Sequence, residues 1–146
     1  MLPPRIEDTP ELGSAKAEWV AIVDDHDSMR SSLARVFRLE YIPAVAFASA
    51  EEYLEASMPS LPCCLVLDMQ LPGMRGLELA QFLHRTRPPV PPIIFISAHE
   101  DLLGSLDGSA IAHGRLRKPF DLEDLLGLVR PLLSGAAVEL SRAGVR

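Results

Sequence analysis

The chain has 146 residues, of which 48% are hydrophobic and 23% are charged, and its formal net charge is −6. This composition is typical of one globular domain with its own core, and it excludes a disordered chain. Because acidic residues outnumber the scattered lysines and arginines, we expect no direct nucleic acid contact by this segment.

Both ends of the chain are predicted to lie outside the folded domain. Residues 1–16 contain prolines, a glycine and acids without periodicity, which predicts a flexible N-terminal arm. Residues 17–133 are expected to form the domain, and residues 134–146 a C-terminal tail or linker stub. The N-terminus lacks the apolar segment of a secretory signal, and no apolar run approaches the length of a membrane span. We therefore expect a cytoplasmic protein that makes no membrane contact.

Short apolar runs bounded by turn residues predict five buried strands, at residues 19–23, 44–46, 63–67, 93–96 and 115–117. Periodicity and capping residues predict helices at residues 28–39, 49–57 and 77–86, a glycine-interrupted helix at 100–112, and a last helix from 121 that Pro131 ends or kinks. This alternation favours an α/β fold, a doubly wound five-stranded parallel sheet with helices on both faces. The carboxyl ends of the strands would then open at one edge, where such sheets keep their ligand sites.

The two cysteines, Cys63 and Cys64, are adjacent in a predicted strand. Neighbouring strand residues point to opposite faces, so the two thiols are not expected to bridge each other. We interpret them as small core residues of a protein in a reducing compartment.

Polar residues follow four of the predicted strands, namely Asp24 and Asp25, Asp68, Ser97, and Lys118. Neighbouring aspartates cannot both point the same way, so one can face a cation while the other orients the site. Magnesium prefers such hard oxygen ligands and keeps several waters, so two or three carboxylates suffice. The sequence therefore predicts a site for a divalent cation and a phosphoryl group.

The other polar groups suit phosphoryl transfer. Asp68 stands alone at its strand end and can serve as a metal ligand or as a nucleophile that forms an aspartyl phosphate. Lys118 supplies an ammonium that would neutralise the transferring oxygens. Ser97 offers a hydroxyl that could bind the phosphoryl group only after transfer, so its strand and the following loop would move as a switch.

None of the four histidines shows the spacing of a metal site. His26 and His99 fall near the predicted crevice. We interpret both as polar loop residues at its rim rather than as catalytic groups.

These motifs resemble a known family. They are Val-Asp-Asp at residues 23–25, Leu-Asp-Met-Gln-Leu-Pro-Gly-Met-Arg-Gly at 67–76, Ile-Ser-Ala-His at 96–99 and Arg-Lys-Pro-Phe at 117–120. From about residue 19 to residue 133 the chain resembles the receiver domain of bacterial two-component response regulators, in the CheY-like superfamily. The sequences of these motifs are most similar to those of regulators whose receivers often precede a helix-turn-helix output domain. The resemblance implies a flavodoxin-like sheet with strand order 2-1-3-4-5.

The resemblance also implies residue roles. Asp68 is the expected phosphoacceptor. Asp24, Asp25 and the backbone carbonyl of Gln70 are the expected further ligands of Mg2+, with Asp25 the more direct of the two acids. Lys118 and Ser97 keep the contact and switch roles given above. Gln70 and His99 would flank the phosphoryl group and tune its lifetime.

The resemblance further implies the partners. The phosphoryl donor would be a histidine kinase or a phosphotransfer protein. The receiver would be either stand-alone or truncated from a longer regulator, so its target would be a downstream protein or a missing output domain. The domain would slowly lose its phosphoryl group without being a turnover enzyme. The output face would comprise the segment 100–112, the last strand and the last helix.

Two departures from the family pattern concern that output face. Arg115 stands where the family often has an aromatic residue, and the segment from Ser97 to Lys118 is about one residue short. Two other interpretations stay open. A phosphohydrolase is disfavoured because Gln70 stands where such enzymes commonly need a second acid. A docking receiver that works without phosphorylation remains the alternative, because Arg115 alters the output face.

Overall fold

The computed structural model describes residues 18–133. The predicted arm and tail, residues 1–16 and 134–146, lie outside the described residues. Within the described part, all strands are parallel and form one sheet in the order β2-β1-β3-β4-β5. The strands are β1 (Val20–Val23), β2 (Ala44–Phe47), β3 (Cys64–Asp68), β4 (Ile93–Ser97) and β5 (Ala112–Arg117). The predicted doubly wound fold and its strand order are confirmed.

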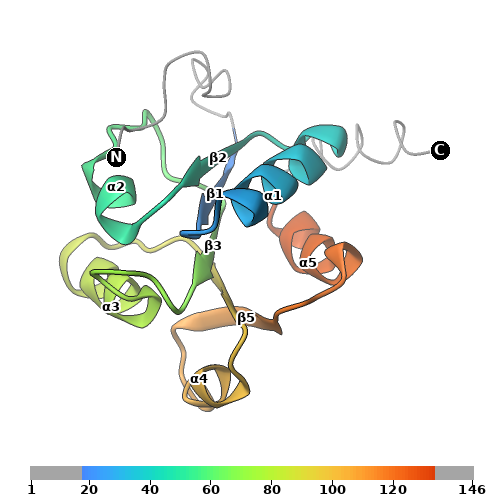
Figure 1. Cartoon of the computed structure of the whole chain (residues 1–146). Helices are drawn as coiled ribbons and strands as arrows, with labels where there is room; N and C mark the ends of the chain where they lie inside the picture. The colour runs from blue at the N-terminus through green and yellow to red at the C-terminus, as the bar shows by residue number, and fades with distance from the viewer. Residues whose placement is uncertain (1–17, 134–146) are drawn as a thin grey trace.

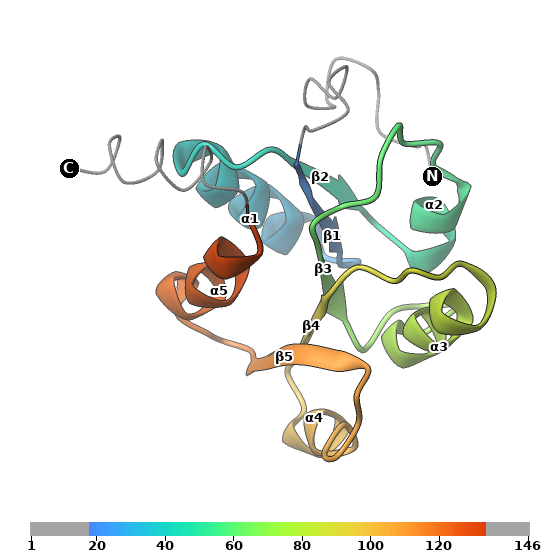
Figure 2. The same ribbon diagram turned by 180° about the vertical axis from the view of Figure 1, so that it is seen from behind.

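Helices cover both faces of this sheet. They are α1 (Asp27–Leu39), α2 (Ala50–Glu55), α3 (Gly76–Thr86), α4 (Glu100–Gly104) and α5 (Leu122–Val129), and the 3-10 turn Arg130–Leu132 follows α5. Helices α1 and α5 lie on one face, α2 and α3 lie on the other, and α4 lies beside the edge strand β5 (Figure 1). The view from behind shows the same arrangement (Figure 2).

The strand sequences explain this layering. Every residue of β1, β3 and β4 is buried, because these strands are covered on both faces. Their odd-numbered apolar residues pack with α2, α3 and α4, and their even-numbered ones pack with α1 and α5. The edge strand β5 alternates between half-buried and exposed residues. The buried central strands therefore fix the positions of the polar residues at their carboxyl ends.

The predicted helix at 100–112 is wrong in its length. Helix α4 ends at Gly104, a turn with Gly108 at φ 77° follows, and β5 begins at Ala112 rather than at residue 115. Glycine weakens a helix, and at positive φ it favours a turn. Gly114 pairs with β4, and its missing side chain leaves room for Leu128 of α5. The helix therefore ends earlier, and the last strand begins earlier, than the sequence predicted.

Within residues 18–133, no helix combines the length and the hydrophobicity that a membrane span requires.

Candidate functional site

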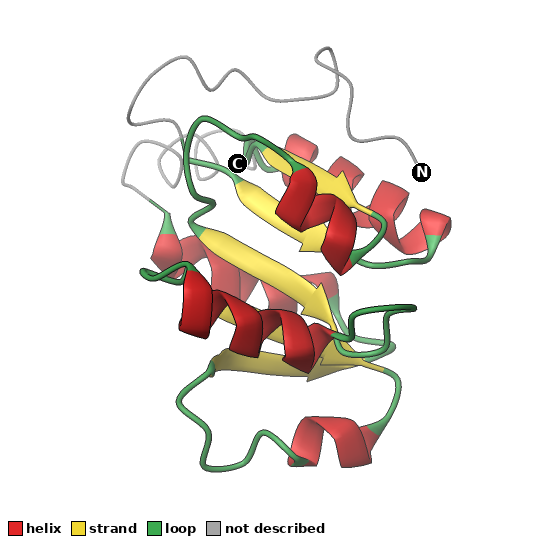
Figure 3. Cartoon of the chain, turned by 90° about the vertical axis from the view of Figure 1, so that its left-hand side faces the viewer, coloured by secondary structure: helices red, strands yellow, loops and turns green. Residues whose placement is uncertain are grey.

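The sheet register brings the polar strand ends to one edge. Asp68 pairs with Ile96, the residue before Ser97, and Ser97 pairs with Arg117, the residue before Lys118. The backbone pairing continues past the strands, because the N–H of Lys118 donates to the carbonyl of Ser97 at 2.8 Å. The strands all point toward this edge (Figure 3). The parallel topology thus gathers side chains that are far apart in the sequence.

Lys118 lies between two buried carboxylates. Its Nζ donates to Asp24 Oδ2 at 2.9 Å and to Asp68 Oδ2 at 3.0 Å. Asp24 and Asp68 are 0% and 2% exposed. Two carboxylates this close would repel each other in a poorly hydrated site, and the ammonium compensates that repulsion.

Backbone N–H groups hold the remaining oxygens of these acids. Asp68 Oδ1 accepts from the N–H of Gln70 at 2.9 Å, and Asp24 Oδ1 accepts from the N–H of His26 at 2.9 Å. Both are turns in which an aspartate binds the backbone two residues further along the chain. Each carboxylate is therefore oriented by one N–H group and by the lysine, before any ligand arrives.

Burial dominates the electrostatics of the pair. Desolvation raises the pKa of Asp68 above its ordinary value, although the N–H of Gln70 and the ammonium of Lys118 act against it. For Lys118, burial by itself lowers the pKa, but the hydrogen bonds to Asp24 and Asp68 outweigh it and leave the pKa above the ordinary value. The lysine is therefore held as a cation, facing an acid that is costly to keep ionised.

The residues fit a divalent cation. Ligand atoms of Asp24, Asp25, His26 and Asp68 all lie within 4.8 Å of one another. The Asp25 side chain is 32% exposed and marks the side of the cluster that opens to solvent. Carboxylate oxygens are ligands that Mg2+ accepts. Gln70 contacts Asp68 through its N–H, and the ligand role of its carbonyl stays a prediction.

Ser97 is fully buried at the end of β4, and its Oγ accepts from the N–H of His99 at 3.0 Å. The hydroxyl therefore holds the first turn of the loop that enters α4, for which His99 is the N-cap residue. A group that drew this hydroxyl away would also release the turn.

Two supporting residues escaped the sequence analysis. A Cβ on Gly76 would collide with the carbonyl oxygen of Asp68 and would lie 2.8 Å from Met69 Cα. Only glycine therefore lets α3 start directly against the end of β3. The intervening loop is fastened to α2, because Glu51 Oε2 accepts from the N–H of Met74 at 2.9 Å. The loop sequence marked a turn, but not these long-range contacts.

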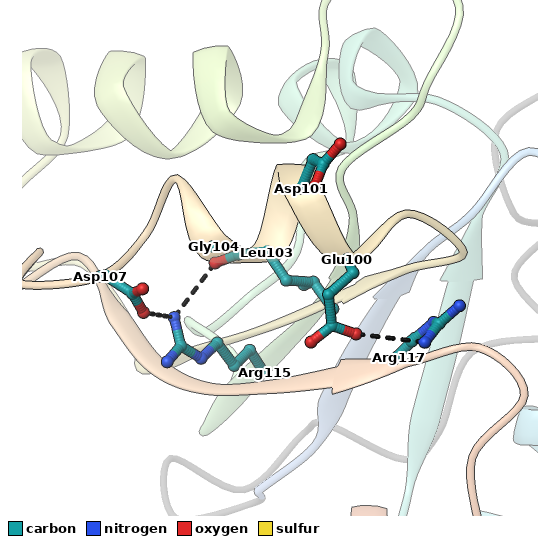
Figure 4. A pocket seen from close by; sticks show the side chains of 7 residues that line it. All are labelled: Glu100, Asp101, Leu103, Gly104, Asp107, Arg115 and Arg117. Atoms are coloured by element: carbon teal, nitrogen blue, oxygen red, sulfur yellow. Dashed lines mark hydrogen bonds and ion pairs between the residues drawn. The ribbon is translucent and has the colours of Figure 1, made fainter.

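Arg115 and Arg117 line an open groove of about 550 Å³ between α4 and β5, together with Glu100, Asp101, Leu103, Gly104 and Asp107 (Figure 4). Arg115 Nη1 donates to the carbonyl of Leu103 at 3.1 Å, and its guanidinium pairs with Asp107. Arg117 Nη1 lies 3.3 Å from Glu100 Oε2. A cation at the last carbonyls of a helix is favourable, so Arg115 holds the C-terminal end of the short α4.

Sequence comparisons agree with this geometry. The response regulator receiver domain model matches residues 20–130. Nodulation protein W of Bradyrhizobium diazoefficiens is 42% identical over 113 aligned positions, and the alignment covers 75% of this chain and 48% of that protein. Response regulator protein TodT of Pseudomonas putida is 33% identical over 133 aligned positions, and the alignment covers 89% of this chain and 57% of that protein. The chain thus spans about half the length of these relatives.

Solved structures show the same fold. Response regulator StyR superposes with a TM-score of 0.72 at 33% identity, covering 87% of this chain and 64% of that one. Response regulator protein TrrA of Thermotoga maritima, solved in complex with Mg2+-BeF, gives a TM-score of 0.70 at 25% identity over 80% of this chain and 99% of that one.

Proposed function

Because the chain belongs to the family of response regulator receiver domains, we propose that it is a phosphorylation-controlled regulatory module with Asp68 as the phosphoacceptor. One observation carries this proposal. The Asp68 carboxylate lies 3.0 Å from the Lys118 ammonium, at a strand end where two more acids converge. A carboxylate beside a fixed cation is suited to receive a phosphoryl group, because the cation offsets the charge that gathers on the transferring oxygens.

In the proposed transfer, an oxygen of Asp68 forms a bond to phosphorus while the bond from phosphorus to the nitrogen of a donor phosphohistidine breaks. The electron pair of the broken bond stays with the donor imidazole. A bound Mg2+, held by Asp24, Asp25, Asp68 and the carbonyl of Gln70, would supply further positive charge against the phosphoryl oxygens. Lys118 binds one of those oxygens as a point charge.

We assign the switch to Ser97. Phosphoryl oxygens at Asp68 offer new acceptors to a hydroxyl that now accepts from the N–H of His99. Drawing the hydroxyl toward them would release the loop before α4 and shift α4 against β5. The α4-β5-α5 face, where Arg115 pairs with Asp107, would carry the change to a downstream protein or an output domain.

The proposed donors are a sensor histidine kinase or a phosphotransfer protein, and the proposed compartment is the cytoplasm. The domain would lose its phosphoryl group slowly rather than turn over substrates. A docking receiver that needs no phosphorylation is the second candidate. It is favoured by Arg115, whose contacts with Leu103 and Asp107 hold α4 without any phosphoryl group.

Phosphoryl labelling separates these functions. The protein is incubated with Mg2+ and radiolabelled acetyl phosphate, and the adduct is tested for stability in acid and lability in base. Wild type is expected to label, D68N to remain unlabelled, and D121N, which changes an exposed acid at the start of α5, to label like wild type. Absence of label from acetyl phosphate and from kinases would favour the docking receiver, and turnover of free phosphoesters would favour a hydrolase.

A further inference from the structure

Glu51 connects α2 with the loop that follows Asp68. It lies in the first turn of α2, and its Oε2 accepts from the N–H of Met74 at 2.9 Å, although 23 residues separate them in the sequence. Gly73 approaches the same oxygen so closely that an added Cβ would lie 2.7 Å from it. Gly73 also has φ 71°, a conformation that glycine adopts readily. The loop between β3 and α3 is therefore shaped around this carboxylate.

The start of α2, which carries Glu51, is itself held by the sheet. Glu52 Oε1 accepts from the N–H of Ala48 at 3.1 Å, which closes the entry to the helix. The carbonyl of Phe47, at the end of β2, accepts from the N–H of Asp24 at 3.1 Å. Glu51 therefore lies on a helix start that is fixed to the carboxyl ends of β1 and β2.

The loop that Glu51 holds carries a proposed ligand of the metal. The N–H of Gln70 donates to Asp68 Oδ1 at 2.9 Å, which orients the peptide unit before Gln70. The carbonyl of Gln70 belongs to the following peptide unit, so its direction depends on the next residues of the loop as well. The bond from Glu51 to Met74 restrains those residues from the side of α2.

We propose that Glu51 is a positioning residue, which sets the affinity of the site for Mg2+ by holding the loop that carries the Gln70 carbonyl. Glu51 is not among the acids of the cluster at Asp24, Asp25 and Asp68. Groups outside a metal site that orient its ligands commonly change the metal affinity when they are removed. This inference rests on the proposed function for the location of the metal. It goes beyond that function in assigning a role to a residue of α2.

Calorimetric titration of the protein with MgCl2 alone tests this role. Wild type, E51A, E51Q and E55A are compared at constant ionic strength. E51A removes the hydrogen-bond acceptor, so we expect Mg2+ binding to weaken by about 3- to 10-fold. E51Q removes the charge but keeps an oxygen that can accept from the N–H of Met74, so its affinity should stay within about twofold of wild type. E55A removes an exposed carboxylate at the other end of α2 and should match wild type.

The variants separate a hydrogen bond from a long-range charge effect. An equal loss of Mg2+ affinity in E51A and E51Q would overturn the proposal, because the charge of Glu51 would then be responsible. Equal affinity in wild type and E51A would overturn it as well. Backbone spectra of each variant in the absence of metal establish that it is folded.

Amide hydrogen exchange measures the bond itself, without metal or a phosphoryl donor. The N–H of Met74 is expected to exchange about 10-fold faster in E51A than in wild type, and to remain protected in E51Q and E55A. Similar exchange of Met74 in wild type and E51A would overturn the proposal.

The two proposals fail separately. Failure of wild type to label at Asp68 would contradict the proposed function, while the exchange of Met74 would still report on Glu51. Normal labelling of wild type together with unchanged Mg2+ affinity in E51A would contradict only the role of Glu51.

Discussion

Two regions of this molecule pair acids with bases in opposite environments. In the acid–lysine pocket, defined by Asp24, Asp68 and Lys118, the side chains are 0%, 3% and 14% exposed. In the groove between α4 and β5, Arg115 is 46% exposed and Asp107 is 67% exposed. Charge interactions are strong and costly to leave unpaired in a buried site. In an exposed site they are weak and screened by salt.

Under the proposed function, the two environments would serve two tasks: the buried pocket would carry out phosphoryl transfer, and the exposed groove would signal to a partner. The acid–lysine pocket keeps its charged groups in one arrangement. If one side chain moved away, the charge of its buried partner would be left uncompensated. The groove holds α4 through contacts that water and salt can replace. Under the proposed function, a small change at Ser97 would therefore alter the groove while the pocket keeps its geometry.

The largest expected effect comes from removing the buried cation. K118M leaves Asp24 and Asp68 facing each other without their shared ammonium, so we expect it to lower the free energy of unfolding by about 3–5 kcal/mol, as for a broken buried ion pair. R115M removes the exposed pair with Asp107 and should cost about 0–1 kcal/mol. Urea unfolding of both variants without divalent ions measures the difference. Equal losses would contradict the contrast.

Glycine substitutions compare backbone crowding in the two regions. In G76A the new Cβ meets the backbone at Asp68 and Met69, so we expect a loss of about 1–3 kcal/mol from overpacking. In G104A, at the end of α4 in the groove, the new Cβ meets nothing within 4 Å. That change should be neutral or stabilise α4 by up to about 1 kcal/mol. Thermal and urea unfolding provide the measurement, and similar losses in both variants would argue against a tightly constrained start of α3.

Replacement of Arg115 tests whether phosphorylation of Asp68 and partner binding depend on different regions. R115Y removes the hydrogen bond to the Leu103 carbonyl and the pair with Asp107, while the acid–lysine pocket is unchanged. We expect normal labelling of Asp68 and altered affinity for the downstream partner. R35Y, on the exposed side of α1, is the matched control and should change neither. Unchanged partner binding in R115Y would remove the case for a diverged output face.

The last prediction concerns the rate at which the thiol of Cys63 is alkylated. Burial, with smaller help from Glu18, raises the pKa of Cys63 to about 11, and burial raises the pKa of Cys64 as well. A raised thiol pKa means less thiolate at neutral pH, so alkylation of Cys63 by iodoacetamide should be slow at pH 7 and rise about tenfold per pH unit toward pH 11. A plateau near pH 9 would indicate an ordinary thiol.

Much of the pocket was predictable because its positions follow from topology. Apolar runs predicted the strands, and parallel strands bring Asp24, Asp68 and Ser97 to one edge whatever the loops do. The collision that Gly76 avoids and the contact between the His26 ring and Asp24 were not predictable. They depend on where a helix start meets a strand end, and no local pattern encodes such contacts.

The groove was the least predictable region. Gly104 and Gly108 weaken the helical signal, and a short sequence window cannot tell a turn from an interrupted helix. Arg115 was identified as a departure, but its contacts with Leu103 and Asp107 arise only once α4 ends early. Because the sequence predicted too long a helix, it could not predict which residues Arg115 contacts.

Chemical trapping of the phosphorylated residue tests the central claim most directly. The protein is phosphorylated with acetyl phosphate and Mg2+, reduced with borohydride, which converts an aspartyl phosphate to homoserine, and mapped by peptide mass spectrometry. We predict homoserine at position 68 alone, and none when Mg2+ is chelated. Homoserine at position 24 or 25, or an unmodified Asp68 under every donor, would contradict the assignment of Asp68 as the phosphoacceptor.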